Sequence, residues 1–169
     1  EMANNQEIRM ENTPAIQPVL NKDLTRVASG YGMRIDPVYH VRKFHQGMDF
    51  TAPTGTEVFA TGNAKVKFSG WKQGYGNTIT LDHGFGYETV YAHLYKSLVR
   101  KGQKVRRSDI IGLVGNTGKS TGPHLHYEVR LNDRPVDPRN YYFYDLATNF
   151  DWSRNTSLGL AEDMGVEKI

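Results

Sequence analysis

Short runs rich in β-branched, aromatic and aliphatic residues recur through most of this 169-residue chain, and turns rich in glycine separate them. Such runs are typical of antiparallel β-structure, and the 17 glycines suit frequent turns. No long amphipathic pattern indicates a helix. The chain is therefore predicted to be all-β and antiparallel. Strands are expected near residues 24–33, 57–60, 64–71, 77–82, 88–94, 103–105, 110–114 and 124–131.

The last of these strands contains two histidines one residue apart, His124 and His126. Because side chains alternate across a strand, both share one face with Glu128, and the apolar residues between them share the other. Two neighbouring imidazoles bring polar nitrogens that need partners, which is costly in an ordinary core. The pair suits a metal ligand beside a proton carrier.

Two earlier segments offer further ligands. His45 and Asp49 are four residues apart, but Gly47 between them argues against a helix and for a turn entering a strand. Both side chains can still converge in such a turn. In the strand at 88–94, strict alternation places Tyr91 and His93 on the same face.

The metal and its chemistry follow from the residue types that are present. The chain has no cysteine, which excludes thiolate zinc sites, disulfides and cysteine nucleophiles. A catalytic zinc usually takes three protein ligands, and five candidates are available, so spacing alone does not assign them. The His-Glu-x-x-His signature of other zinc hydrolases is absent, and proton transfer therefore falls to histidine.

Several motifs occur together in a characteristic order. The Gly-rich run at 115–122 is not a phosphate-binding loop, because it leads through Pro123 into a strand and not into a helix. Over residues 29–141 the chain instead resembles the lysostaphin-type, or LytM-type, zinc endopeptidases of bacterial cell walls. The resemblance rests on His-x-x-x-Asp at 45–49, Tyr-Ala-His-Leu around His93, Lys-Gly-Gln-Lys-Val at 101–105, and Gly-x-Thr-Gly-x-Ser-Thr-Gly-Pro-His-Leu-His ending at His126.

The resemblance implies a two-layer antiparallel sheet, partly open and barrel-like, with a substrate groove and short irregular extensions at both ends. One Zn²⁺ ion would be held by His45, Asp49 and His126. His124 would be the general base for water activated by the zinc. His93 would stabilise the tetrahedral intermediate or protonate the departing amine, and Tyr39, in the loop before the first ligand, would lie near the developing oxyanion.

The same resemblance implies that the substrate is the stem peptide or cross-bridge of peptidoglycan, and we favour the direct cross-link between peptides. It places the protein in the cell envelope, periplasmic or extracellular, or as the ectodomain of a membrane-anchored protein whose anchor lies outside this sequence. Residues 23–144 are expected to form the peptidase domain, preceded by a lead-in (1–22) that forms at most a short helix or edge strand. A polar tail (145–169) follows it, for which a lid role is the less favoured reading.

Net charge does not point to nucleic acid. The value is +3, with one basic cluster of Lys101, Lys104, Arg106 and Arg107 that we interpret as a solvated loop in preference to a polyanion site. His83 lies in a Gly-rich turn and is interpreted as structural. Two alternatives remain: a non-haem iron oxygenase, which also uses two histidines and a carboxylate, and a wall-binding or amidase-activating module without turnover.

Overall fold

A computed structural model of the chain describes residues 2–20, 27–35 and 39–144. Within them, antiparallel strands dominate, with one N-terminal helix and a short 3₁₀ helix. The elements are α1 (Met2–Asn12), β1 (Val27–Ser29), β2 (Gly32–Ile35), β3 (Arg42–His45), β4 (Met48–Thr51), β5 (Glu57–Phe59), β6 (Ala64–Lys72), β7 (Gly76–Gly84), β8 (Tyr87–Ser97), β9 (Lys104–Val105), β10 (Ile110–Val114), β11 (His124–Leu131), β12 (Arg134–Val136) and η1 (Pro138–Tyr141).

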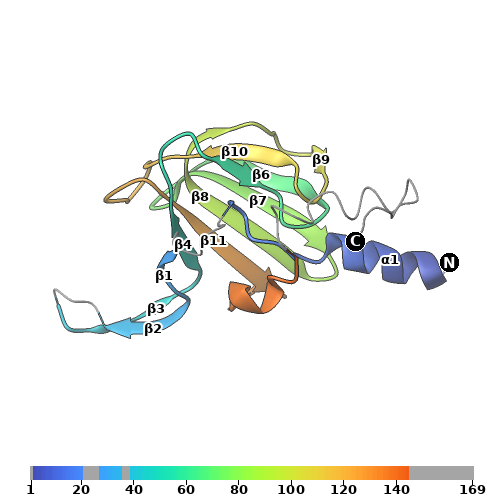
Figure 1. The fold of residues 1–169 in the computed structure, drawn as a ribbon, viewed down its shortest axis with the longest axis horizontal. Helices are drawn as coiled ribbons and strands as arrows, with labels where there is room; N and C mark the ends of the chain where they lie inside the picture. The colour runs from blue at the N-terminus through green and yellow to red at the C-terminus, as the bar shows by residue number, and fades with distance from the viewer. Residues whose placement is uncertain (1, 21–26, 36–38, 145–169) are drawn as a thin grey trace.

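The main sheet of the described residues has the strand order β1-β4-β11-β8-β7-β6-β9, with β12 beside β11 (Figure 1). Strand β8 changes partners along its length: residues 87–92 pair with β11, and residues 94–97 pair with β10. Because β10 also pairs with β5, the sheet branches at β8 into a second, smaller layer. The all-β, two-layer and partly open architecture predicted from the sequence is confirmed.

The hydrophobic core joins the two layers. Leu125 and Tyr127 on β11, and Val129 beyond them, are fully buried, as the alternation along this strand predicts. They pack in one cluster with Val58 and Ile111 from the smaller layer. Each such side chain contributes about 1.5–3 kcal/mol through burial, so the opposite face of β11 is held in a fixed position.

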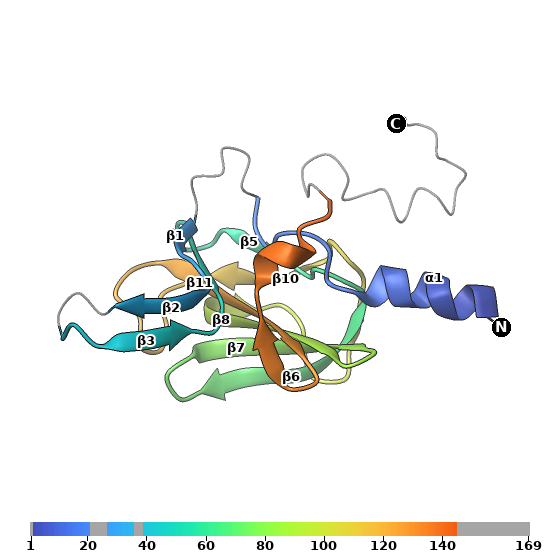
Figure 2. The same ribbon diagram turned by 90° about the horizontal axis from the view of Figure 1, so that it is seen from below.

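Helix α1 is anchored to the sheet at its carboxyl end and otherwise extends away from it (Figures 1 and 2). Arg107 Nη2 donates to the carbonyl oxygens of Met10 (2.7 Å) and Thr13 (3.0 Å), and to that of Glu11. A cation suits this end of a helix, whose last carbonyls lack partners within it. After the helix, Ile16 and Val19 are buried. The N-terminal extension is thus more regular, and more closely packed on the sheet, than expected.

Strands β2 and β3 form a separate two-stranded sheet (the β2–β3 hairpin) that projects from the opposite end of the molecule (Figures 1 and 2). The hairpin leads directly into β4, so its base lies at the site described below. Among the described residues, none of the helices has the length and apolar character needed to cross a membrane.

The strands predicted at 57–60, 64–71, 77–82, 88–94, 103–105, 110–114 and 124–131 correspond to β5 to β11, with ends that differ by up to three residues. The aromatic patch after residue 140 closes part of the core, because Tyr141 and Tyr142 pack against the main cluster. The start of the strand predicted at 24–33, part of the loop before His45, and the tail from residue 145 lie outside the described residues.

Candidate metal centre

The corner between β3 and β4 brings His45 and Asp49 together, with His45 Nε2 3.2 Å from Asp49 Oδ2. Gly47 makes the corner possible, because a Cβ there would overlap the carbonyl oxygen of Tyr127 on β11. The chain therefore passes close to β11 as a turn entering a strand, as predicted, and not as a helix.

Strand β11 supplies His124 and His126 from one face. The antiparallel register sets His126 opposite Asp49, and His126 Nδ1 lies 2.8 Å from Asp49 Oδ1. His124 Nε2 is 3.9 Å from the same oxygen. Two segments separated by more than seventy residues thus meet around one carboxylate.

Glu128 completes the same face of β11 and is fully buried. Its carboxylate accepts hydrogen bonds from His126 Nε2 (2.8 Å), the Tyr75 hydroxyl (2.6 Å) and Arg130. Burial raises the pKa of Glu128, but the hydrogen bonds from His126 and Tyr75 outweigh it and lower that pKa to about 2. Glu128 is therefore an ionised carboxylate that orients the His126 ring, and not a surface ion pair.

His93 reaches the site through an irregularity in β8, so the prediction that it shares a face with Tyr91 is wrong. Tyr91 packs against Tyr127 in the core, whereas the His93 ring lies 4.7 Å from that of His124. Asn77 and Ile79 of β7 pair with Leu94 and Tyr91, which leaves an extra residue in β8 at this point. His93 has a φ of 62°, and this bulge turns its side chain to the other face.

Backbone carbonyls fix the orientation of three imidazoles. The Nδ1 atoms of His45, His93 and His124 lie 2.8, 2.7 and 2.8 Å from the carbonyl oxygens of Gly30, Thr117 and Gly122. A carbonyl only accepts, so each Nδ1 carries a proton, and Nε2 is the nitrogen that each ring turns away from the backbone carbonyl. His126 differs, because both of its nitrogens face carboxylates: Nε2 faces Glu128 and Nδ1 faces Asp49.

The electrostatics of the cluster suit a bound cation. Burial raises the pKa of Asp49, but hydrogen bonds with His126 and His45 outweigh it and hold that pKa well below its usual value. Burial lowers the pKa of His126, and its two carboxylate partners raise it to about 9. Ligand atoms of His45, Asp49 and His126 all lie within 4.8 Å of one another. This nitrogen, oxygen and nitrogen set fits zinc.

The cluster lines an open pocket of about 340 Å³ that also contains His93 and His124. Sequence reasoning missed four of its lining residues: Gln46, Gly74, Tyr75 and Lys119. Tyr75 lies in the turn between β6 and β7, and its ring meets that of His126 edge-on at 5.7 Å. The glycines on either side of Tyr75 were the signal in the sequence, because they indicate a tight turn. In the structure Gly76 has a φ of 70° and packs against the 117–118 backbone.

Tyr39 is the one predicted site residue that the structure does not bring into this pocket. It lies between β2 and β3, near the tip of the hairpin, and is 75% exposed. The tyrosine that lines the pocket is Tyr75, and its hydroxyl donates to Glu128.

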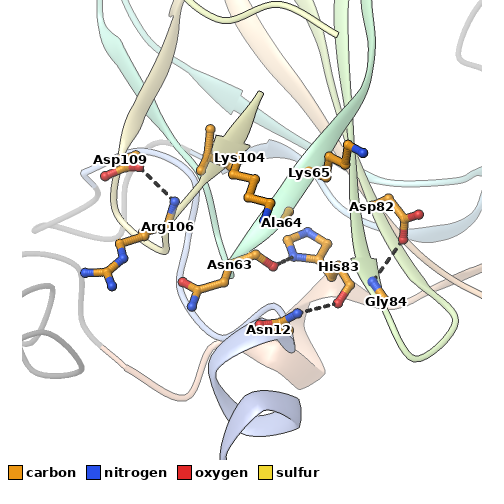
Figure 3. Close-up of a pocket in the computed structure, with 11 residues that line it drawn as sticks. Asn12, Asn63, Ala64, Lys65, Asp82, His83, Gly84, Lys104, Arg106 and Asp109 are labelled. Carbon is orange, nitrogen blue, oxygen red and sulfur yellow. Dashed lines mark hydrogen bonds between the residues drawn. The ribbon is translucent and has the colours of Figure 1, made fainter. Parts of the chain in front are cut away.

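A second pocket, of about 650 Å³, lies beside the carboxyl end of α1 (Figure 3). It has charged side chains of both signs, including Lys104 and Asp82, and it contains none of the described His and carboxylate clusters that could hold a metal. His83 at its base is buried, with its Nδ1 3.0 Å from the Asn63 carbonyl oxygen.

An open antiparallel sheet that carries a His-Asp-His cluster able to hold a metal ion, with two further imidazoles facing it, fits a zinc metallopeptidase domain. The chain belongs to peptidase family M23, whose sequence profile matches residues 43–138. This membership confirms the resemblance found in the sequence and removes the oxygenase alternative.

Relatives of known name and structure support this placement. The chain is 47% identical over 114 residues to the DD-carboxypeptidase/endopeptidase Mpg of Neisseria meningitidis, a match that covers 68% of this chain and 26% of that protein. It is 45% identical over 113 residues to the peptidoglycan DD-endopeptidase ShyA of Vibrio cholerae, covering 66% and 26%. The chain thus spans about a quarter of the length of these curated relatives.

Solved structures agree in fold. A zinc-containing peptidase from Vibrio cholerae has a TM-score of 0.69 and 40% identity, covering 76% of this chain and 40% of that one. The catalytic domain of lysostaphin from Staphylococcus simulans has a TM-score of 0.62 and 34% identity, covering 69% of this chain and 90% of that domain.

Proposed function

We propose that this chain is a zinc-dependent endopeptidase that hydrolyses the cross-links or stem peptides of bacterial peptidoglycan. The observation that carries the proposal is one open pocket in which three potential metal ligands face two further imidazoles, each with its Nδ1 held by a backbone carbonyl. The proposed peptidase domain spans residues 23–144, with the preceding segment packed against it.

The proposed zinc ligands are His45 Nε2, the Asp49 carboxylate and His126 Nδ1. When bound there, zinc would act as a Lewis acid toward the scissile carbonyl and lower the pKa of water. Gly30 and Glu128 support the two imidazoles from behind, through the hydrogen bonds already described. Such partners fix ring orientation and hold each ligand in its binding tautomer.

Proton transfer is assigned to His124 and His93. His124 Nε2 faces Asp49 and takes a proton from the attacking water, because its Nδ1 is committed to the Gly122 carbonyl. The His93 ring lies 4.7 Å from that of His124. Burial lowers the pKa of His93, so a proton that its Nε2 acquires during the reaction is readily passed on to the departing amine. A role for Tyr39 at the oxyanion stays a prediction that requires the hairpin to approach the substrate.

The bond that is cut is proposed from relatives. The names of Mpg and ShyA describe DD-endopeptidases, and ShyA's name specifies peptidoglycan. We therefore propose the direct peptide cross-link as the substrate of this chain, and the cell envelope as its place of action.

Digestion of purified peptidoglycan by the zinc-loaded protein tests the proposal. Wild type is expected to release fragments with new amino termini, identified by mass spectrometry. The His126→Ala variant should lose zinc, because it removes a ligand. The His124→Ala variant should keep zinc and lose hydrolysis, because it removes only the base.

Zinc content and digestion must be measured on the same samples. Full activity of His124→Ala would contradict the assigned base. An unchanged wall with zinc-loaded wild type would instead support the alternative, a wall-binding or amidase-activating module of the same fold.

A further inference from the structure

The charges of the pocket are divided between its floor and its mouth. The carboxylates among its lining residues, Asp49 and Glu128, are engaged by histidines, and Glu128 also by Tyr75 and Arg130. The cation among the lining residues is Lys119, whose side chain belongs to an exposed residue. A ligand entering the pocket therefore meets a positive charge first.

Lys119 is presented from a fixed backbone. Its N–H donates to the carbonyl oxygen of Gly74 (3.1 Å), in the same turn as Tyr75. Next to it, Gly118 has a φ of 74°, and a Cβ there would overlap the backbone of Gly76. This close packing holds the loop of Lys119 against the β6–β7 turn.

The β2–β3 hairpin supplies positive charge at the other side of the site. Gly32 pairs with His45, and Arg34 pairs with Lys43, two residues further along each strand. Arg34 and Lys43 therefore lie on the same face as the proposed ligand His45, about 7 Å outward along the hairpin. Strands β11 and β8 separate β4, which follows the hairpin, from β7, which follows the turn of Tyr75. The two groups of cations thus flank these central strands.

Arg34 and Lys119 have no neutralising partner within the described part of the chain: no carboxylate there forms an ion pair with either side chain. A third cation, Lys72, lies over the ring of Tyr75 at 5.2 Å from its centroid. Positive charges without counterions on two sides of a site raise the local concentration of anionic ligands there.

We propose that Lys119 and Arg34 bind carboxylate groups of the substrate, and that the pocket selects acidic peptides over uncharged ones. This inference rests on the proposed function and names the substrate class. Peptides of the direct cross-link carry free carboxyl groups, whereas a bridge of glycines carries none along its length. The cations therefore favour the direct cross-link on grounds of charge, independently of any relative.

Binding of two uncleavable peptides to the zinc-loaded protein tests the proposal. The first is a ketomethylene analogue of a cross-linked stem peptide with its carboxylates free, and the second is the same analogue with those carboxylates amidated. Dissociation constants are measured by titration calorimetry at low and at moderate salt. The variants are Lys119→Gln and Arg34→Gln, and Lys101→Gln is the matched control, an exposed lysine near the far edge strand β9.

Each of Lys119→Gln and Arg34→Gln should weaken binding of the free-carboxylate peptide by about 3- to 10-fold, the range for partly exposed charge-assisted pairs. Binding of the amidated peptide should stay within about 2-fold, and the loss should shrink at higher salt. Zinc content and the Lys101→Gln variant should match wild type.

Equal weakening of both peptides, or of neither, would overturn the inference, as would failure of wild type to prefer the free-carboxylate peptide. Cleavage of the natural peptide by wild type is scored separately. Cleavage without charge preference leaves the proposed function standing and removes the inference. Charge-selective binding without cleavage would support the inference and contradict the proposed function.

Discussion

His83 should make folding of this protein sensitive to mild acid, at a distance from the metal site. Its side chain is 1% exposed, with Nε2 2.7 Å from Thr89 Oγ1. Its Nδ1 lies 3.0 Å from the carbonyl oxygen of Asn63 (Figure 3). Burial lowers the pKa of His83 to about 4, with Arg107 contributing in the same direction. The buried ring is therefore neutral near pH 6, where the unfolded chain already takes up a proton.

The magnitude follows from the difference between the pKa values in the two states. The shift from 6.5 to about 4 corresponds to about 3 kcal/mol, since one pKa unit equals about 1.4 kcal/mol. Because the folded-state pKa is depressed, this stability is fully present above pH 6.5 and is lost as the pH falls toward 4. Most of it, about 2.5 kcal/mol, should be gone by pH 4.5.

Urea unfolding of wild type and His83→Gln, followed by circular dichroism between pH 7.5 and 4.5 with equal zinc, measures this effect. Acid also protonates the metal ligands, but that loss is common to both proteins and cancels in the difference. Wild type should lose about 2.5 kcal/mol more than the variant. Identical pH dependence would refute the reasoning. If the variant fails to fold, the His83 ring signals in wild-type NMR should still show a neutral imidazole at pH 5, and a protonated ring there would refute it equally.

Three other substitutions test zinc binding, the corner between β3 and β4, and the anchoring of α1. Glu128→Gln should weaken zinc binding about 10- to 100-fold in chelator competition, because it removes the charge behind His126. The control is Glu88→Gln, since Glu88 pairs with Lys67 and not with a histidine of the site. Equal zinc affinities of the two variants would contradict the role of Glu128. Gly47→Ala should cost about 2 kcal/mol or more in unfolding free energy and weaken zinc binding, because its Cβ overlaps β11. Gly122→Ala, where a Cβ meets nothing within 4 Å, should be nearly neutral, and similar losses in both would count against the overlap. Arg107→Ala should cost about 2 kcal/mol and reduce the helical signal, since three carbonyls at the end of α1 lose their donor. Arg106 is exposed, so Arg106→Ala should leave the helix intact. An unchanged helical signal in both variants would contradict the proposed role of Arg107 at the end of α1.

The sequence predicts much of the site because the relevant geometry is local. The two histidines of β11 share a face because a strand repeats every two residues, and no distant contact is needed to establish this. His45 and Asp49 converge because Gly47 permits a tight corner between them. The strands themselves are short and bounded by glycines, so their positions were accessible from pattern alone.

The errors and omissions have a common cause in the pairing of distant strands. Alternation places His93 on the same face as Tyr91, but the bulge where β8 pairs with β7, between its pairings with β11 and β10, turns His93 to the other face. Tyr75 belongs to a turn that becomes part of the site only when β7 pairs with β8. Tyr39 is close to the first ligand in sequence, yet the β2–β3 hairpin carries it outward.

The sequence by itself determined the residue types of the metal centre, the face that His124 and His126 share, and the turn that joins His45 to Asp49. These depend on backbone periodicity and on side-chain chemistry, which act over a few residues. Only the tertiary structure decided the face of His93, the support of His126 by Glu128 and Tyr75, and the positive mouth of the pocket. Each of these requires segments far apart in the chain to pack in one register, because sheet hydrogen bonds and core burial set that register across the whole sheet.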